Sequence, residues 1–140
     1  MITYVDTSTL LKLIIEEDGS DRAAIIWASS DAVASVTLLV VEARAALAAA
    51  RRGKRLTGPQ HATAVTELDA LVSDLHIVSV TDELVATAAE LADMEGLRGY
   101  DAVHLAAALT VEAAVLSSAD TDLCAAAARR GLHLANPLLT

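Results

Sequence analysis

The sequence predicts an α/β fold with a short, mainly parallel β-sheet flanked by α-helices. Short apolar strand segments alternate with longer helical segments along the chain. Hydrophobic residues make up 54% of the sequence although Phe is absent, so the core must be built from Ala, Leu, Val and Ile, which suits helices packed closely on a short sheet. The length of 140 residues is near the commonest domain size. We therefore expect residues 1–140 to form one domain.

The predicted elements are separated by Gly, Pro and polar residues. The predicted strands, all short and apolar, cover residues 2–5, 32–36, 77–80, 113–117 and 132–135. The predicted helices, with apolar residues at helical spacing, cover residues 7–17, 20–29, 38–52, 81–95, 100–110 and 120–130, with one more that opens at 58–59. Ser20 is the expected cap of the second helix, and Gly53 ends the third. The alternation of strands and helices indicates parallel pairing.

The composition limits the classes of function. Charged residues break the apolar runs before they reach the roughly 18 to 20 residues of a membrane span, and the first residues lack the features of a secretory signal. The single cysteine, Cys124, cannot form an internal disulfide, so we expect a soluble protein of the reducing cytoplasm. A net charge of -9 argues against binding of nucleic acid by a basic surface, but it allows an acidic nuclease in which metal ions supply the positive charge.

Five acidic residues lie close to predicted strand ends or helix starts. In an open parallel sheet, ligands bind beyond the carboxyl ends of the strands, so acids placed there are candidates for function. Asp6 follows the first strand, Asp120 and Asp122 follow the fourth, Glu42 lies one turn into the helix after the second, and Asp101 opens the helix before the fourth. Taken singly, each aspartate is explained equally well as a helix cap or as a favourable charge in a first helical turn.

Glu42 is harder to explain as a solvated surface residue, because it interrupts an apolar segment at residues 38–43. A buried carboxylate needs a positive partner, and Arg44, two residues away, does not face Glu42 on a helix. Three or four converging carboxylates would provide the oxygen ligands that Mg²⁺ and Mn²⁺ prefer. Repulsion among these carboxylates would raise their pKa values until a cation arrives.

Four segments resemble the signature blocks of one known family, the PIN domains. They are residues 4–13 (YVDTSTLLKL), 37–42 (TLLVVE), 99–106 (GYDAVHLA) and 116–123 (LSSADTDL). The four blocks occur in the family's order and span nearly the whole chain, so the combination is far more specific than any one block. The chain length and the first block are most similar to the VapC-type toxins of bacterial and archaeal toxin–antitoxin pairs.

This resemblance implies a Mg²⁺- or Mn²⁺-dependent endoribonuclease that hydrolyses RNA. Such a toxin is usually a homodimer, and a small VapB-like antitoxin silences it by inserting a segment into the active-site groove. By position, the resemblance implies that Asp6, Glu42, Asp101 and Asp120 form the catalytic, metal-binding acidic quartet. Asp122 is then a further acid near the metal.

Two serines extend the match, and one leucine departs from it. Ser8 occupies a small polar position of the family that can bond a ligand carboxylate, and we expect Ser118 to act in the same way. Leu123 departs from the pattern, because many relatives carry an aromatic residue there; we expect this change to affect packing more than chemistry.

We expect Asp6 and Asp101 to be the principal ligands of the metal ion. Glu42 would be a further ligand or a base held behind the ligands, and the Asp120/Asp122 pair would bind a weaker or second ion. His104 lies one turn after Asp101, but its apolar neighbours favour packing over a role as a base.

Other interpretations stay open at this point. Basic residues at 51–55 either steer RNA toward the site or balance the end of a helix, and Trp27 belongs to the core or to a partner interface. A phospho-acceptor domain is disfavoured, because Ser8 stands where a phosphatase would carry its second Asp. The remaining alternatives to a toxin are a catalytically silent PIN-fold binding protein and a housekeeping RNA-processing nuclease.

Overall fold

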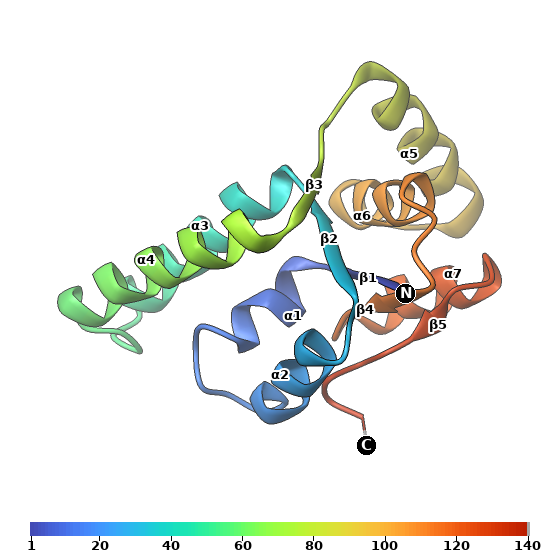
Figure 1. The fold of residues 1–140 in the computed structure, drawn as a ribbon. Coiled ribbons are helices and arrows are strands. Elements are labelled where there is room, and N and C mark those ends of the chain that lie inside the picture. Colours follow the sequence, from blue (N-terminus) through green and yellow to red (C-terminus); the bar gives the residue numbers. More distant parts are fainter. Residues whose placement is uncertain (140) are drawn as a thin grey trace.

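A five-stranded parallel sheet organises the computed structural model, which describes residues 1–139 (Figure 1). Along the chain the elements are β1 (Ile2–Val5), α1 (Thr7–Lys12), α2 (Ser20–Ala28), β2 (Ala32–Val36), α3 (Leu38–Arg52), α4 (Gly58–Asp74), β3 (His76–Val78), α5 (Asp82–Glu95), α6 (Gly99–Thr110), β4 (Val115–Ser117), α7 (Thr121–Arg129) and β5 (His133–Leu134). The strand order is β3-β2-β1-β4-β5, and every pairing is parallel. The predicted α/β class is confirmed.

Strand β1 lies at the centre of the sheet. Its residue Tyr4 pairs with Ala34 of β2 on one side and with Leu116 of β4 on the other. Because parallel strands share a direction, the segments that follow β1, β2 and β4 all leave from the same edge of the sheet. This edge carries Asp6, the start of α3 and the loop before α7.

The two faces of the sheet carry separate hydrophobic cores. Consecutive side chains of a strand point to opposite faces, and accordingly Tyr4 packs in one core and Val5 in the other. The Tyr4 core contains residues of α5, α6 and α7, and the Val5 core contains residues of α1, α3 and α4. Helix α6 packs against the sheet, and four of its alanines are fully buried: Ala102, Ala106, Ala107 and Ala108. Because the core has no Phe, small side chains such as these alanines fill part of it.

Side-chain caps begin several of the helices. The Asp6 side chain accepts a hydrogen bond from the backbone N–H of Thr9 at the start of α1, and Asp120 accepts one from Leu123 at the start of α7. Thr57 and Gln60 form a reciprocal capping box at the start of α4. Two of the acidic residues singled out in the sequence therefore do act as helix caps, in addition to any other role.

Some predicted boundaries are wrong. Helix α1 ends at Lys12 rather than at residue 17. Ser20 is the first residue of α2 and not its cap; the cap is Gly19, with φ of 90°, and a Cβ at Gly19 would lie 2.9 Å from the Pro137 carbonyl oxygen. The side chain of Ser20 instead accepts from Glu17 N and donates to the Ile15 carbonyl. Contacts with the distant C-terminal segment fix this turn, which local sequence signals do not report.

Helices α3 and α4 pair with each other and extend beyond the sheet, with the loop between them at the far end (Figure 1). The basic segment at residues 51–55 is exposed there, with Arg51 and Arg52 at the end of α3 and Lys54 and Arg55 in the loop. Trp27 is partly buried against the Val5 core, on the α2 side of the molecule. Among the helices of residues 1–139, none combines the length and the apolar character needed to cross a bilayer.

Candidate active site

Asp6 is a buried carboxylate at the centre of the candidate site. It directly follows β1 and is only 5% exposed. Its Oδ1 accepts hydrogen bonds from Ser8 Oγ at 2.6 Å and from the backbone N of Thr9 at 3.1 Å, and its Oδ2 accepts one from Ser118 Oγ at 2.5 Å. Donors of this kind stabilise the charged carboxylate inside the protein. The side chain is thus held in one orientation before any ligand binds.

The loop after β4 is tied to the same carboxylate. Ser118, fully buried, donates to Asp6 and accepts from the backbone N of Asp120 at 2.9 Å. Ser8 likewise accepts from the backbone N of Ala119 at 2.9 Å. These two serines link the end of β1 to the start of α7. The spacing between Asp6 and Asp120 is therefore set by hydrogen bonds on both sides.

Glu42 reaches this edge from the first part of α3. Its Oε1 accepts from Thr7 Oγ1 at 2.9 Å and lies 2.7 Å from Nε2 of His104, a residue of α6. Burial acts to raise the pKa of Glu42, but hydrogen bonding and charge interaction with His104, together with the Thr7 hydrogen bond, leave the pKa below its usual value. Glu42 is thus stabilised as a carboxylate by two neighbouring side chains.

Asp101 and Asp120 face a shared cation, the guanidinium of Arg98. Arg98 Nε lies 3.0 Å from Asp101 Oδ2, and Arg98 Nη2 lies 2.8 Å from Asp120 Oδ2. Burial raises the pKa of Asp101, and the charge of Asp120 adds to this effect, while Arg98 opposes it without cancelling it. These two carboxylates therefore lie close enough to repel each other and to need positive charge between them.

Comparison with known proteins identifies the family of this chain. The sequence profile of the PIN domain matches residues 3–129, which include all four carboxylates and both serines. The chain belongs to the PIN-domain family. The "Ribonuclease VapC45" of Mycobacterium tuberculosis is 40% identical over 110 residues, which cover 79% of this chain and 76% of that protein.

Solved PIN structures share the fold at low sequence identity. The structure of FitAcB from Neisseria gonorrhoeae has a TM-score of 0.76 at 19% identity, and the match covers 100% of both chains. A toxin–antitoxin complex from Klebsiella pneumoniae has a TM-score of 0.63 at 17% identity, covering 85% of this chain and 87% of that chain. At such identities these matches show the fold alone, and they agree with the PIN arrangement described above.

The structure brings four of the five predicted acids of the PIN site into one connected network. Asp6 is linked through Ser118 to the backbone N–H of Asp120, and the carboxylates of Asp120 and Asp101 are linked through Arg98. Thr7, which follows Asp6 in the chain, donates a hydrogen bond to Glu42. The fifth acid, Asp122, is exposed on the first turn of α7. Its charge contributes to a raised pKa of Arg98, whose main cause is the hydrogen bond to Asp101.

Sequence reasoning missed two partners of these acids. Arg98 was not considered, although it is the only Lys or Arg between Arg55 and Arg129 and lies three residues before Asp101. His104 was assigned to packing. It is buried at 2% exposure, as that assignment requires, but it also provides the partner that Glu42 lacked in the sequence analysis. Its position three residues after Asp101, on the same face of α6, was the available signal.

The donor set fits a divalent cation in its chemistry. Carboxylates are the hard oxygen ligands that Mg²⁺ and Mn²⁺ take. Hydroxyl or backbone donors hold those of Asp6, Glu42 and Asp120, and Asp101 and Asp120 share a positive group in Arg98. Among residues 1–139, no three His, Cys, Asp or Glu side chains converge as closely as a formed metal site requires. Arg98, the residue just before α6, is 79% exposed and pairs with both carboxylates at the surface.

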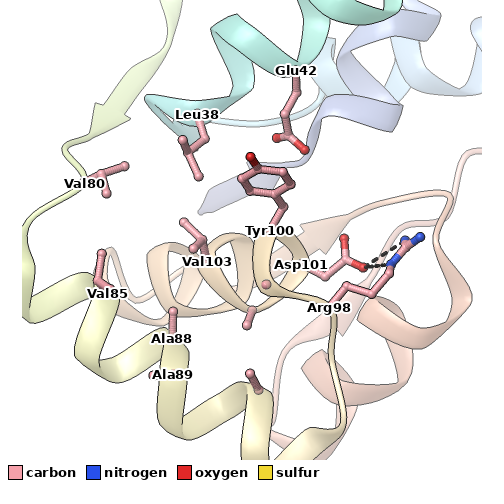
Figure 2. A pocket seen from close by; sticks show the side chains of 13 residues that line it. Leu38, Glu42, Val80, Val85, Ala88, Ala89, Arg98, Tyr100, Asp101 and Val103 are labelled. Carbon is pink, nitrogen blue, oxygen red and sulfur yellow. Dashed lines mark hydrogen bonds and ion pairs between the residues drawn. The ribbon is translucent and has the colours of Figure 1, made fainter.

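A groove of about 640 Å³ lies beside the network, between α3, α5 and α6 (Figure 2). Glu42 and Asp101 lie along it from two different helices, and its walls are mostly apolar, with Leu38, Val85 and Val103 among them. The site therefore combines a strip of carboxylates with an adjacent hydrophobic surface.

Cys124 lies near the network but is unsuited to nucleophilic chemistry. It is 6% exposed, and burial, with smaller contributions from the charges of Asp6 and Asp120, raises its pKa to about 11. A thiol with such a pKa carries almost no thiolate at neutral pH. The Cys124 thiol is therefore a poor nucleophile at neutral pH.

Proposed function

We propose that this PIN protein is a divalent-metal-dependent endoribonuclease that hydrolyses RNA phosphodiester bonds and acts as the toxin of a type II toxin–antitoxin pair. The observation that carries the proposal is the network of Asp6, Glu42, Asp101 and Asp120 at the carboxyl edge of the sheet. The similarity to Ribonuclease VapC45 supports RNA as the substrate.

The four carboxylates provide the ligands for Mg²⁺ or Mn²⁺. When bound, such an ion neutralises charge on the scissile phosphate and lowers the pKa of water for attack. Asp6 is the most firmly held ligand, because three donors fix it. Asp101 has the carboxylate most in need of added positive charge, as its raised pKa indicates. Glu42 is placed either to bind a cation or to accept a proton from water, and Asp120 with Asp122 extends the acidic strip.

Hydrolysis also needs the RNA to be brought to a protein of net charge -9. Near the site, Arg98 is the basic residue in contact with the acidic network, and its exposed guanidinium can reach a phosphate once it leaves the carboxylates. The exposed basic loop at residues 51–55 adds positive charge at the far end of the α3–α4 pair. We assign to it a secondary role in steering RNA.

The partner that we propose is a small VapB-like antitoxin. Support comes from the toxin–antitoxin complex from Klebsiella pneumoniae, in which one chain shares the fold of this protein. The apolar groove beside Glu42 and Asp101 is the surface on which a segment of such a protein would block the site. We further propose that residues 1–140 form one domain, that the protein is a homodimer and that it acts in the cytoplasm.

The test is cleavage of a mixed RNA pool by purified protein in Mg²⁺, in Mn²⁺ and in EDTA. We expect cutting in either ion and none in EDTA, and we expect Asp6→Asn and Asp101→Asn to abolish it. Asp69→Asn is the matched control, because Asp69 is exposed on α4 and contributes to no part of the site. A folded, antitoxin-free wild-type protein that cuts no RNA under any ion would overturn the proposal in favour of a catalytically silent PIN-fold binding protein.

A further inference from the structure

The His104 side chain is buried between a hydroxyl and a carboxylate. Its Nδ1 lies 2.7 Å from Tyr4 Oη and its Nε2 lies 2.7 Å from Glu42 Oε1, and the residue is 2% exposed. Both ring nitrogens are therefore occupied. We propose that His104, oriented by Tyr4, is a positioning residue that sets the Glu42 carboxylate for the reaction. This inference rests on the proposed function.

The hydrogen-bond roles follow from the inventory of donors. The Tyr4 hydroxyl is fully buried and has one proton to donate. When the imidazole carries a single proton and the hydroxyl donates to Nδ1, that proton is on Nε2 and is donated to Glu42 Oε1. This tautomer satisfies the hydroxyl, both ring nitrogens and Oε1 of Glu42 at once. Tyr4 thus determines which nitrogen of His104 faces Glu42.

The two donors to Glu42 act on the same oxygen. Thr7 Oγ1 and His104 Nε2 both bond Oε1, and within residues 1–139 no hydrogen bond is made to Oε2. Glu42 lines the groove, and Figure 2 shows its carboxylate directed from α3 toward Tyr100. One oxygen of Glu42 is therefore held by the protein, while the other is left for a ligand or a proton.

The contact also links the two sides of the sheet. Leu105, next to His104 on α6, belongs to the core on the Tyr4 face, whereas Leu39 and Ala43 of α3 belong to the core on the Val5 face. Leu38, at the start of α3, also packs on the Tyr4 core, so the beginning of this helix lies close to α6. The bonds of His104 to Tyr4 and to Glu42 fix Glu42 relative to β1 and α6 together.

A double-mutant cycle separates positioning from simple structural support. His104→Leu removes the donor to Glu42, Glu42→Gln removes the charged acceptor, and the pair is combined. We expect His104→Leu to lower kcat by about 10- to 100-fold with little change in KM, the range usual for residues that orient ligands. In the Glu42→Gln background, the same change should lower kcat by less than about threefold. His104→Gln, which keeps an N–H near the Nε2 position, should recover most of the activity.

A second readout does not depend on RNA cleavage. Mn²⁺ affinity, measured by titration calorimetry, should fall in His104→Leu and recover in His104→Gln, whereas His76→Leu, a change at an exposed histidine of β3, should leave it unchanged. If His104→Leu does not fold, Tyr4→Phe removes only the hydroxyl and should lower kcat and Mn²⁺ affinity in the same direction.

The possible outcomes distinguish the two proposals. In the first outcome, wild-type protein cuts RNA, but His104→Leu has an effect of equal size in both backgrounds and His104→Gln recovers no activity. This outcome overturns the inference while the proposed function stands. Wild-type protein that binds Mn²⁺ but does not cut RNA contradicts the proposed function, and the cycle in Mn²⁺ affinity then decides the inference. Wild-type protein that does neither overturns both.

Discussion

Nη2 of Arg98 lies 2.8 Å from the Asp120 carboxylate and 3.0 Å from the Asp101 carboxylate, which Nε of Arg98 also contacts at 3.0 Å. It occupies carboxylate oxygens that a divalent cation would also use. A divalent cation bound as proposed would therefore compete with Arg98 for the same negative charge.

We predict from this competition that Arg98→Gln binds Mn²⁺ more tightly than wild type. The expected gain is about tenfold, a modest value because the guanidinium is exposed and solvent screens its charge. Titration calorimetry at fixed ionic strength provides the measurement. Arg129→Gln is the control, since Arg129 pairs with Glu95 outside the site. Equal affinities for Arg98→Gln and wild type would contradict the competition.

A second prediction concerns the fixed geometry of Asp6. Ser118→Ala removes the donor to Asp6 and the acceptor of the Asp120 backbone N–H, and both groups are at least partly buried. The free energy of unfolding should fall by about 1–3 kcal/mol, the cost of leaving buried polar groups unpaired. Urea unfolding in EDTA measures it. Ser73→Ala, an exposed position on α4, should stay within about 0.5 kcal/mol of wild type; a similar loss at both serines would argue against a special role for Ser118.

A third prediction follows from the lowered pKa of Glu42. A carboxylate whose pKa is lower in the folded state stabilises the fold at pH values above 4.5, the ordinary pKa of a glutamate. This stabilisation is lost as the pH falls through the folded-state pKa. In EDTA, wild type should therefore be more stable than Glu42→Gln at pH 7, and the difference should shrink below about pH 4.5. Urea unfolding between pH 7 and pH 3 checks this; a difference that does not change with pH would refute the linkage.

Asp101 should behave in the opposite sense, because its pKa is raised. As the pH rises above 3.8, the ordinary pKa of an aspartate, ionisation of Asp101 therefore lowers the free energy of unfolding. We expect Asp101→Asn to have a higher melting temperature than wild type in EDTA at pH 7, while losing the ribonuclease activity that we propose. Adding Mn²⁺ should stabilise wild type more than the variant. A variant that melts below wild type in EDTA would show that the pairing with Arg98 outweighs burial.

Apolar periodicity and turn residues predicted most of the fold. The ranges of β1, β2 and α3 were predicted to the residue, because buried strands and a long Ala-rich helix leave clear patterns. The end of α1 and the cap at Gly19 were not predicted. There the chain is shaped by packing of Ile14 and Ile15 on the Val5 core and by the approach of Pro137, neither of which is a local signal.

The acids of the candidate site were visible in the sequence because each one stands beside a strand end or a helix start. Their partners were not visible in the same way. Glu42 and His104 are 62 residues apart, and Arg98 and Asp120 are 22 apart, so these contacts exist only once the sheet has brought the helices together. A local pattern shows which residue can carry charge, but the tertiary fold decides what compensates that charge.

Three consecutive residues, the last two of β1 and the one that follows it, have three different roles. Tyr4 belongs to one core, Val5 to the other, and Asp6 to the acidic network. A nascent or partly unfolded chain in which β1 has not yet docked between β2 and β4 lacks both cores and the network together. Toxicity in a cell would then be tied to complete folding, so that the protein is harmless while it is being synthesised and becomes active in a single cooperative step.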